Sequence, residues 1–253
     1  MPTPFMHMAF AERIIRDPAL PDPLRSAIKA QWGAFLLGSI APDARVASGI
    51  RRADTHFFEY EPVIAVPPNV VMLTQYPALQ PTHIHDAAHA VFIAGYSAHL
   101  AMDEVWCTDL LFPKFMKLDG GSFSSFQMLH MLLGYLDGRD YAALPIAEQY
   151  PALAGVTLDQ WLPFIPDSAL IAWRDLIAQQ IAPDGHSQTL EILGQRIQMS
   201  ADEMAAFIND TAQMDEKLWH NVPHETVAAV ETTMYDRARD VLIGYLTDYS
   251  GTL

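Results

Sequence analysis

Apolar residues recur along most of the chain at helical spacing. The clearest stripe lies near the carboxyl end, over residues 223–247, and consists of Val227, Val230, Met234, Ala238, Val241 and Leu242. Side chains three and four residues apart lie on one face of an α-helix, so such a stripe is typical of an amphipathic helix packed on a core. The alternation of apolar and polar residues that indicates a β-strand persists nowhere for more than a few residues. The pattern therefore predicts an all-α fold.

Prolines, glycines and capping residues divide this pattern into separate helices. Asp17 and Pro18 end the first one, and Ser200 with Glu203 matches a capping box at the start of a later one. Five prolines between residues 60 and 82 predict that residues 41–82 form a long irregular region. The predicted helices span residues 4–16, 23–38, 83–112, 122–137, 157–164, 166–182, 186–198, 200–219 and 223–247.

Candidate chemistry first appears within the predicted helix 83–112. His99 and Asp103 are four residues apart, which places an imidazole and a carboxylate on one face, a single turn from each other. Imidazole nitrogen and carboxylate oxygen are both zinc ligands. A buried histidine that is hydrogen-bonded to an aspartate one turn away produces the same spacing. The pair alone therefore leaves a metal site and a buried hydrogen-bonded pair as alternatives.

Other residues of the same chemistry precede this pair in a characteristic order. His7 lies near the start, Asp43 follows Gly38 and Pro42 in a Gly-x-x-x-Pro-Asp turn, His56 begins a His-Phe-Phe segment, and His99 and Asp103 follow Gly95 in a Gly-x-x-x-His-x-x-x-Asp helix. This order resembles the zinc-dependent phospholipase C family and the related zinc-dependent single-strand nucleases. The resemblance covers roughly residues 1–115, with the Pro-Asp turn and the His-x-x-x-Asp helix as its most specific parts.

The resemblance implies a ligand set and a domain organisation. It assigns His7 and His56 as imidazole ligands, Asp43 as the carboxylate that binds zinc or polarises its water, and His99 with Asp103 as the helical ligand pair, Asp103 being able to bridge two ions. Five ligands are too many for one tetrahedral zinc with an open water position and suit two ions that share a carboxylate. One or two zinc ions are therefore expected. Residues 1–145 would form the phospholipase C-like helical core, and residues 146–253 a helical extension packed on it.

The chain also departs from the family pattern. Where a further histidine is expected after Asp103, the sequence has Trp106, Cys107 and Asp109, and His130 lacks a glutamate four residues later. A third zinc ion is therefore not predicted. His85 and His89 are also four residues apart, but in a continuous helix they would lie about 21 and 15 Å along the axis from His99, too far to share its cation.

Composition narrows the substrate class. The chain of 253 residues carries 30 acidic and 15 basic residues, a net charge of −15, with no basic run beyond Arg51-Arg52. Proteins that bind long nucleic acids usually present a basic patch, so long nucleic acid is not expected as a partner. The resemblance instead implies a small phosphoester or a lipid headgroup as the substrate. The single cysteine, Cys107, excludes an intramolecular disulfide.

Targeting signals are not evident in the sequence. The first 25 residues include Glu12, Arg13, Arg16 and Asp17 and lack an apolar h-region, so no signal peptide is predicted. No apolar run reaches the roughly 18 residues that a membrane span requires. We therefore expect a cytoplasmic protein without a transmembrane segment.

The resemblance and the residues together favour one function and leave alternatives. The favoured function is a metal-dependent hydrolase in which zinc activates a water, with a phosphoester as the substrate and Asp43 as a catalytic residue. A phosphomonoesterase or small-nucleotide hydrolase is one alternative. A non-catalytic helical protein with a closed structural metal site is the other. Arg45 follows the Pro-Asp turn and is a candidate to grip a phosphate, or else an ordinary surface arginine.

Overall fold

The computed structural model describes residues 1–116, 124–249 and 251, and every regular element within these ranges is a helix. The predicted all-α fold is therefore confirmed. No helix in this described part combines the length and hydrophobicity needed to span a bilayer. The division into residues 1–145 and 146–253 stays a prediction, while the buried apolar side chains of both parts form one continuous cluster.

The first eighty residues contain more helices than predicted. The elements are α1 (Pro4–Arg16), α2 (Asp22–Ala30), α3 (Trp32–Ile40), the 3₁₀-helix η1 (Ala41–Ala44), α4 (Arg45–Ser48), α5 (Arg52–His56), α6 (Pro68–Gln75) and the 3₁₀-helix η2 (Pro77–Leu79). The first helix, 4–16, is confirmed. The single helix over 23–38 is wrong, because Gln31 adopts φ −118° and ψ 34° and separates two helices. The irregular region 41–82 is wrong in part, because Pro68 and Pro77 start helical turns, a position that proline favours.

The middle of the chain holds the longest buried helix. The elements are α7 (Ala87–Val105), which continues as the π-helix η3 (Trp106–Phe115), then α8 (Ser125–Ala143) and α9 (Ile146–Ala154). Helix α7 begins later than the predicted residue 83, because the side chain of Asp86 caps it by accepting a hydrogen bond from the amide of His89. The predicted start of the next helix at residue 122 lies outside the described residues, and Ser124 with Gln127 forms the capping box of α8.

The last hundred residues contain α10 (Asp167–Gln180), α11 (Thr189–Ile197), α12 (Ala201–Asn209), α13 (Thr211–Met214), the π-helix η4 (Asp215–Trp219) and α14 (His224–Thr247). The predicted helix 157–164 is wrong; this segment is irregular, and Gln160 takes a left-handed φ of 53°. The predicted helix 200–219 is broken at Asp210, which caps α13. The helix over 223–247 and the Ser200–Glu203 capping box are confirmed.

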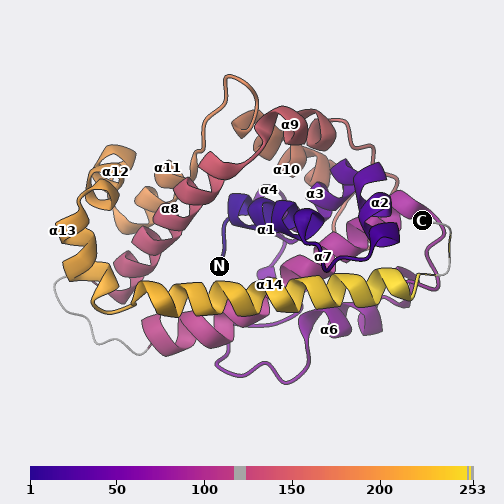
Figure 1. Ribbon diagram of the computed structural model, residues 1–253, viewed down its shortest axis with the longest axis horizontal. Coiled ribbons are helices and arrows are strands. Elements are labelled where there is room, and N and C mark those ends of the chain that lie inside the picture. The colour runs from indigo at the N-terminus through magenta and orange to yellow at the C-terminus, as the bar shows by residue number, and fades with distance from the viewer. Residues whose placement is uncertain (117–123, 250, 252–253) are drawn as a thin grey trace.

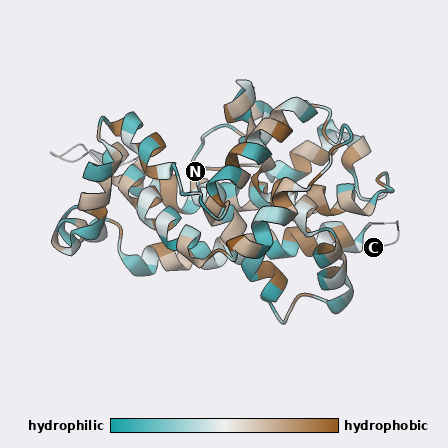
Figure 2. Ribbon diagram, turned by 90° about the horizontal axis from the view of Figure 1, so that it is seen from above, coloured by the Kyte–Doolittle hydropathy of each residue, from teal (hydrophilic) through white to brown (hydrophobic). Residues whose placement is uncertain are grey.

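Helix α7 is the central element of the molecule. It packs most extensively against α3 and α14, and α14 runs along it from the far end of the chain (Figure 1). Most of its side chains are buried, which explains why α7 is apolar around most of its circumference. The outer helices instead alternate hydrophilic and hydrophobic bands, as amphipathic helices do (Figure 2).

Two glycines bring the backbones of α3 and α7 into direct contact. A Cβ atom on Gly38 would lie 2.1 Å from the carbonyl oxygen of Phe92, and one on Gly95 would lie 2.7 Å from the carbonyl oxygen of Phe35. Only glycine permits such an approach. The contact places the end of α3, at Ser39, against the middle of α7, where His99 lies.

Candidate metal centre

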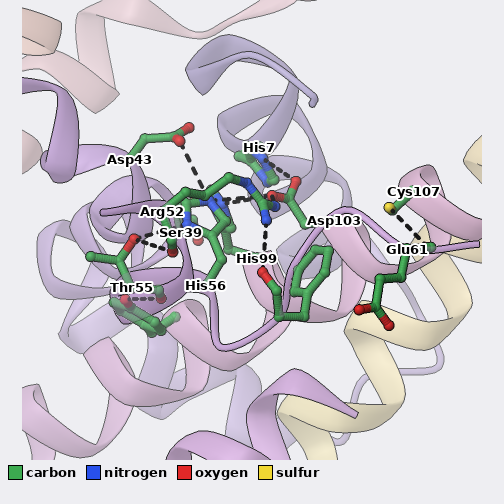
Figure 3. A network of polar contacts seen from close by, with 12 residues as sticks. His7, Ser39, Asp43, Arg52, Thr55, His56, Glu61, His99, Asp103 and Cys107 are labelled. Atoms are coloured by element: carbon green, nitrogen blue, oxygen red, sulfur yellow. Dashed lines mark hydrogen bonds and ion pairs between the residues drawn. The ribbon is translucent and has the colours of Figure 1, made fainter. Parts of the chain in front are cut away.

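Four elements deliver the five predicted ligand residues to one place. His7 comes from α1, Asp43 from η1, His56 from α5, and His99 and Asp103 from α7 (Figure 3). Each of the three imidazoles and Asp103 is at most 1% exposed, and the Asp43 side chain is 17% exposed. The structure thus brings together every residue that the resemblance selected, although these residues span nearly a hundred positions of the chain.

The spacing between these side chains is that of ligands around a common point. One Asp103 oxygen lies 3.6 Å from Nε2 of His7, and the other lies 3.3 Å from Nε2 of His56 and 3.7 Å from Nε2 of His99. These distances exceed the usual 2.7–3.2 Å range of an N–H···O hydrogen bond. Zinc–ligand bonds of about 2.0–2.1 Å at tetrahedral angles separate neighbouring ligand atoms by about 3.3 Å. The geometry therefore suits a shared cation better than a set of hydrogen bonds.

The same atoms lack hydrogen-bond partners. Nε2 of His7, His56 and His99 and one oxygen of Asp103 are buried with no partner in the described part of the chain. Buried polar atoms in folded proteins are almost always paired, so a group of four unpaired ones at a single point requires an explanation. A cation held by His7, His99 and Asp103, whose ligand atoms lie within 4.8 Å of one another, would satisfy three of the four. The donor set, imidazole nitrogens and carboxylate oxygens, is one that zinc accepts.

Two of the imidazoles are oriented by hydrogen bonds on their outer nitrogens. Nδ1 of His99 lies 2.8 Å from the carbonyl oxygen of Ser39 and must donate to it, which leaves Nε2 with a free lone pair. Nδ1 of His56 lies 2.9 Å from Oγ1 of Thr55, whose hydroxyl donates to the carbonyl oxygen of Arg52. His56 therefore also turns its lone pair toward the cluster.

The local environment sets protonation states that favour metal binding. Burial, together with the His99 ring stacked 3.6 Å away, lowers the pKa of His7 to about 4, and burial lowers the pKa of His56. Burial alone would also lower the pKa of His99, but the charge of Asp103 outweighs it and raises that pKa. Despite burial, the neighbouring histidines hold the pKa of Asp103 well below its usual range and lower that of Asp43 to about 2. At pH 7 the carboxylates are thus ionised, and His7 and His56 are neutral, as ligands must be.

Arg52 also belongs to the site, although no motif in the sequence points to it. Its Nη2 donates to Asp103 at 3.1 Å, and its Nη1 donates to the carbonyl oxygen of Phe58 at 3.2 Å. The guanidinium lies over the rings of Phe58 and Tyr60, 4.3 and 4.4 Å from their centroids. The Arg51-Arg52 pair is visible in the sequence, but nothing in its spacing connects it with a carboxylate 51 residues later.

His89 and His130 lie outside the cluster. Nδ1 of His130 pairs with the carbonyl oxygen of Phe126 at 2.7 Å, and Nε2 of His89 with that of Trp161 at 2.8 Å, so both have other partners. Neither belongs to a group of metal-binding spacing in the described residues. Tyr96 and Trp106 are fully buried core residues.

The cluster opens toward a cavity on the side of Asp43. The cavity has a volume of about 180 Å³, and Asp43, Arg45 and Arg52 lie in its wall.

Comparisons with known proteins identify no relative: no family model, no curated protein and no solved structure matches the chain.

Proposed function

We propose that the chain is a metal-dependent hydrolase of small phosphoesters, similar in its chemistry to the zinc-dependent phospholipases C. The observation that carries the proposal is the group of buried ligand atoms of His7, His99 and Asp103, which lie within 4.8 Å of one another near an arginine-containing cavity. These three residues would hold the metal, and His56 and Asp43 would face its open fourth position. A zinc ion bound there supplies a Lewis acid that polarises phosphoryl oxygens and lowers the pKa of water toward neutrality.

The arrangement favours one ion over two. The residues form two groups of ligand spacing, His7 with His99 and Asp103, and Asp43 with His56 and His99. Both groups need His99, whose single free nitrogen can donate to only one cation, because Nδ1 is committed to Ser39. Arg52 provides a second positive charge, paired with Asp103 at 3.1 Å. The proposed centre is therefore one zinc ion with an adjacent guanidinium.

Asp43 is suited to orienting a water. Its carboxylate lies 3.5 Å from Nε2 of His56 and is the one member of the cluster that lines the cavity. With a pKa of about 2, Asp43 stays ionised and accepts hydrogen bonds, but it is a weak proton acceptor near neutral pH. Its role is therefore to hold a water in the direction of the substrate.

A structural metal is the second candidate. His7, His56, His99 and Asp103 are fully buried, and four protein ligands are what a closed structural zinc site uses. The partial exposure of Asp43 and the cavity beside it favour the open, hydrolytic site.

The test is hydrolysis of nitrophenyl phosphate mono- and diesters by chelator-treated protein and by protein reloaded with zinc. The proposal requires activity only after reloading, and it requires Asp43→Asn to lower kcat while the bound zinc is retained. If zinc-saturated protein with an intact fold cleaves neither ester class, the structural-metal candidate replaces the hydrolase.

A further inference from the structure

The cavity beside the metal centre concentrates positive charge in an acidic protein. Three arginines, Arg45, Arg52 and Arg196, line it, and among the described residues Asp43 is its only acidic lining residue. The whole chain has 15 basic and 30 acidic residues. Within the described part of the chain, three of the 15 basic side chains but only one of the 30 acidic side chains therefore line this cavity. An anion that is repelled by most of the surface would be attracted here.

These arginines have unused hydrogen-bond donors. Nε of Arg45 and Nε of Arg52 are buried and lack partners, and neither Arg45 nor Arg196 forms an ion pair with a carboxylate in the described residues. Arg52 uses one nitrogen for Asp103, and its side chain is 11% exposed. Guanidinium groups with free donors are the usual protein partners of phosphate oxygens, which they bind through paired, charge-assisted hydrogen bonds.

The cavity also has an apolar lining. It consists of side chains of α8, α10 and α11, namely Leu133, Trp173, Leu176, Ile177, Ile192 and Leu193. A ligand that fills the cavity would therefore combine a charged group for the arginines with an apolar part for these side chains. With a volume of about 180 Å³, the cavity suits a small phosphoester and not a large ligand.

We infer that this cavity binds a phosphate monoester, with its dianionic phosphoryl group against Arg45, Arg52 and Arg196 and its apolar alcohol portion against α10 and α11. A monoester presents three terminal oxygens and two negative charges, which match the guanidinium groups. A diester has one negative charge and one terminal oxygen fewer to offer the guanidinium groups. This inference rests on the proposed function and specifies its substrate class.

The corresponding reaction is simple hydrolysis. The oxygen of a water forms a bond to phosphorus while the bond from phosphorus to the alcohol oxygen breaks. The electron pair of the broken bond stays on the alcohol oxygen, which takes up one proton from the attacking water. The products are the free apolar alcohol and inorganic phosphate.

The test is calorimetric binding of phenyl phosphate, diphenyl phosphate and inorganic phosphate, with zinc-free and with zinc-loaded protein. Phenyl phosphate should bind tightest in both states. Arg196→Gln, at an exposed position on α11 outside the ligand cluster, should weaken phenyl phosphate binding about 10-fold while leaving zinc content unchanged. Ile192→Asn should weaken phenyl phosphate but not inorganic phosphate. The matched control is Arg16→Gln, because the Arg16 side chain is 67% exposed and pairs with Glu12.

Each outcome decides between the two proposals. Diphenyl phosphate that binds as tightly as phenyl phosphate, or an Arg196→Gln variant that binds like Arg16→Gln, would overturn the monoester inference. Faster hydrolysis of diesters than of monoesters by zinc-loaded protein would also overturn it and leave the hydrolase intact. The predicted binding pattern without hydrolysis would support the ligand class and overturn the hydrolase.

Discussion

Replacing Gly38 with alanine should disturb the metal centre through the contact between α3 and α7. The new Cβ would lie 2.1 Å from the carbonyl oxygen of Phe92 and 2.9 Å from its carbonyl carbon. Contacts of Cβ below 3.0 Å are essentially never found, so α3 must move away from α7 by about 1 Å. Ser39, the next residue, moves with it, and its carbonyl oxygen holds Nδ1 of His99 at 2.8 Å.

The expected magnitude follows from these two displacements. Overpacking of this kind costs about 1–3 kcal/mol, which in a protein of this size lowers Tm by about 2–12 °C. Loss of the hydrogen bond that orients a metal-binding imidazole weakens metal affinity about 10–100-fold. Gly38→Ala should therefore lower both the thermal stability and the affinity for zinc.

The assays are thermal unfolding and zinc titration against a chromophoric chelator. Gly244→Ala is the matched control, because a Cβ there meets nothing within 4 Å. This exposed position within α14 should gain about 0.5–1 kcal/mol from the better helix propensity of alanine, with unchanged zinc affinity. A folded Gly38→Ala protein that binds zinc as tightly as the wild type would refute the reasoning, as would a loss of affinity in the control.

Three further predictions concern metal, ligands and pH. Removing zinc with a chelator should lower Tm. The free energy of unfolding should fall by about 4 kcal/mol if free zinc had been a thousandfold above Kd. An unchanged Tm would contradict a resident metal. His99→Ala should lose bound zinc on elemental analysis while His89→Ala keeps it, and equal loss would mean that the ligands are misassigned. Burial raises the pKa of Asp140 to about 6, so the folded state binds its proton more tightly and loses stability as pH rises from about 4 through 6. In urea unfolding, Asp140→Asn should therefore be more stable than the wild type by about 1–3 kcal/mol at pH 7.5 and similar to it at pH 4, and a gain that is independent of pH would contradict this cause.

Features that depend on neighbouring residues could be predicted from the sequence. The apolar stripe of α14, the capping box at Ser200 and the one-turn spacing of His99 and Asp103 are local patterns, and each appears in the structure as expected. The break at Gln31 was missed, because Gln31 is not itself a helix-breaking residue and Gly33, two residues later, lies inside α3. Prolines also misled the prediction for residues 41–82, since they can start a helix as well as interrupt one.

The candidate site was predictable only in part. His7, Asp43 and His56 were selected by resemblance to a family and not by periodicity, and the structure places them beside the helical pair. The pairing of Arg52 with Asp103 depends on how α5 packs against α7. Arg45 of α4 and Arg196 of α11 likewise line one cavity only because of the tertiary fold. Contacts between distant elements carry no signal in the spacing of residues along one chain.

The most direct test of the metal centre is a crystal of the protein soaked in zinc, with diffraction data collected on both sides of the zinc absorption edge. The account predicts a single anomalous peak among Nε2 of His7, Nε2 of His99 and the carboxylate of Asp103, at about 2.0–2.2 Å from each ligand atom. Absence of a peak at this cluster, while zinc binds at other positions of the same crystal, would contradict the central claim.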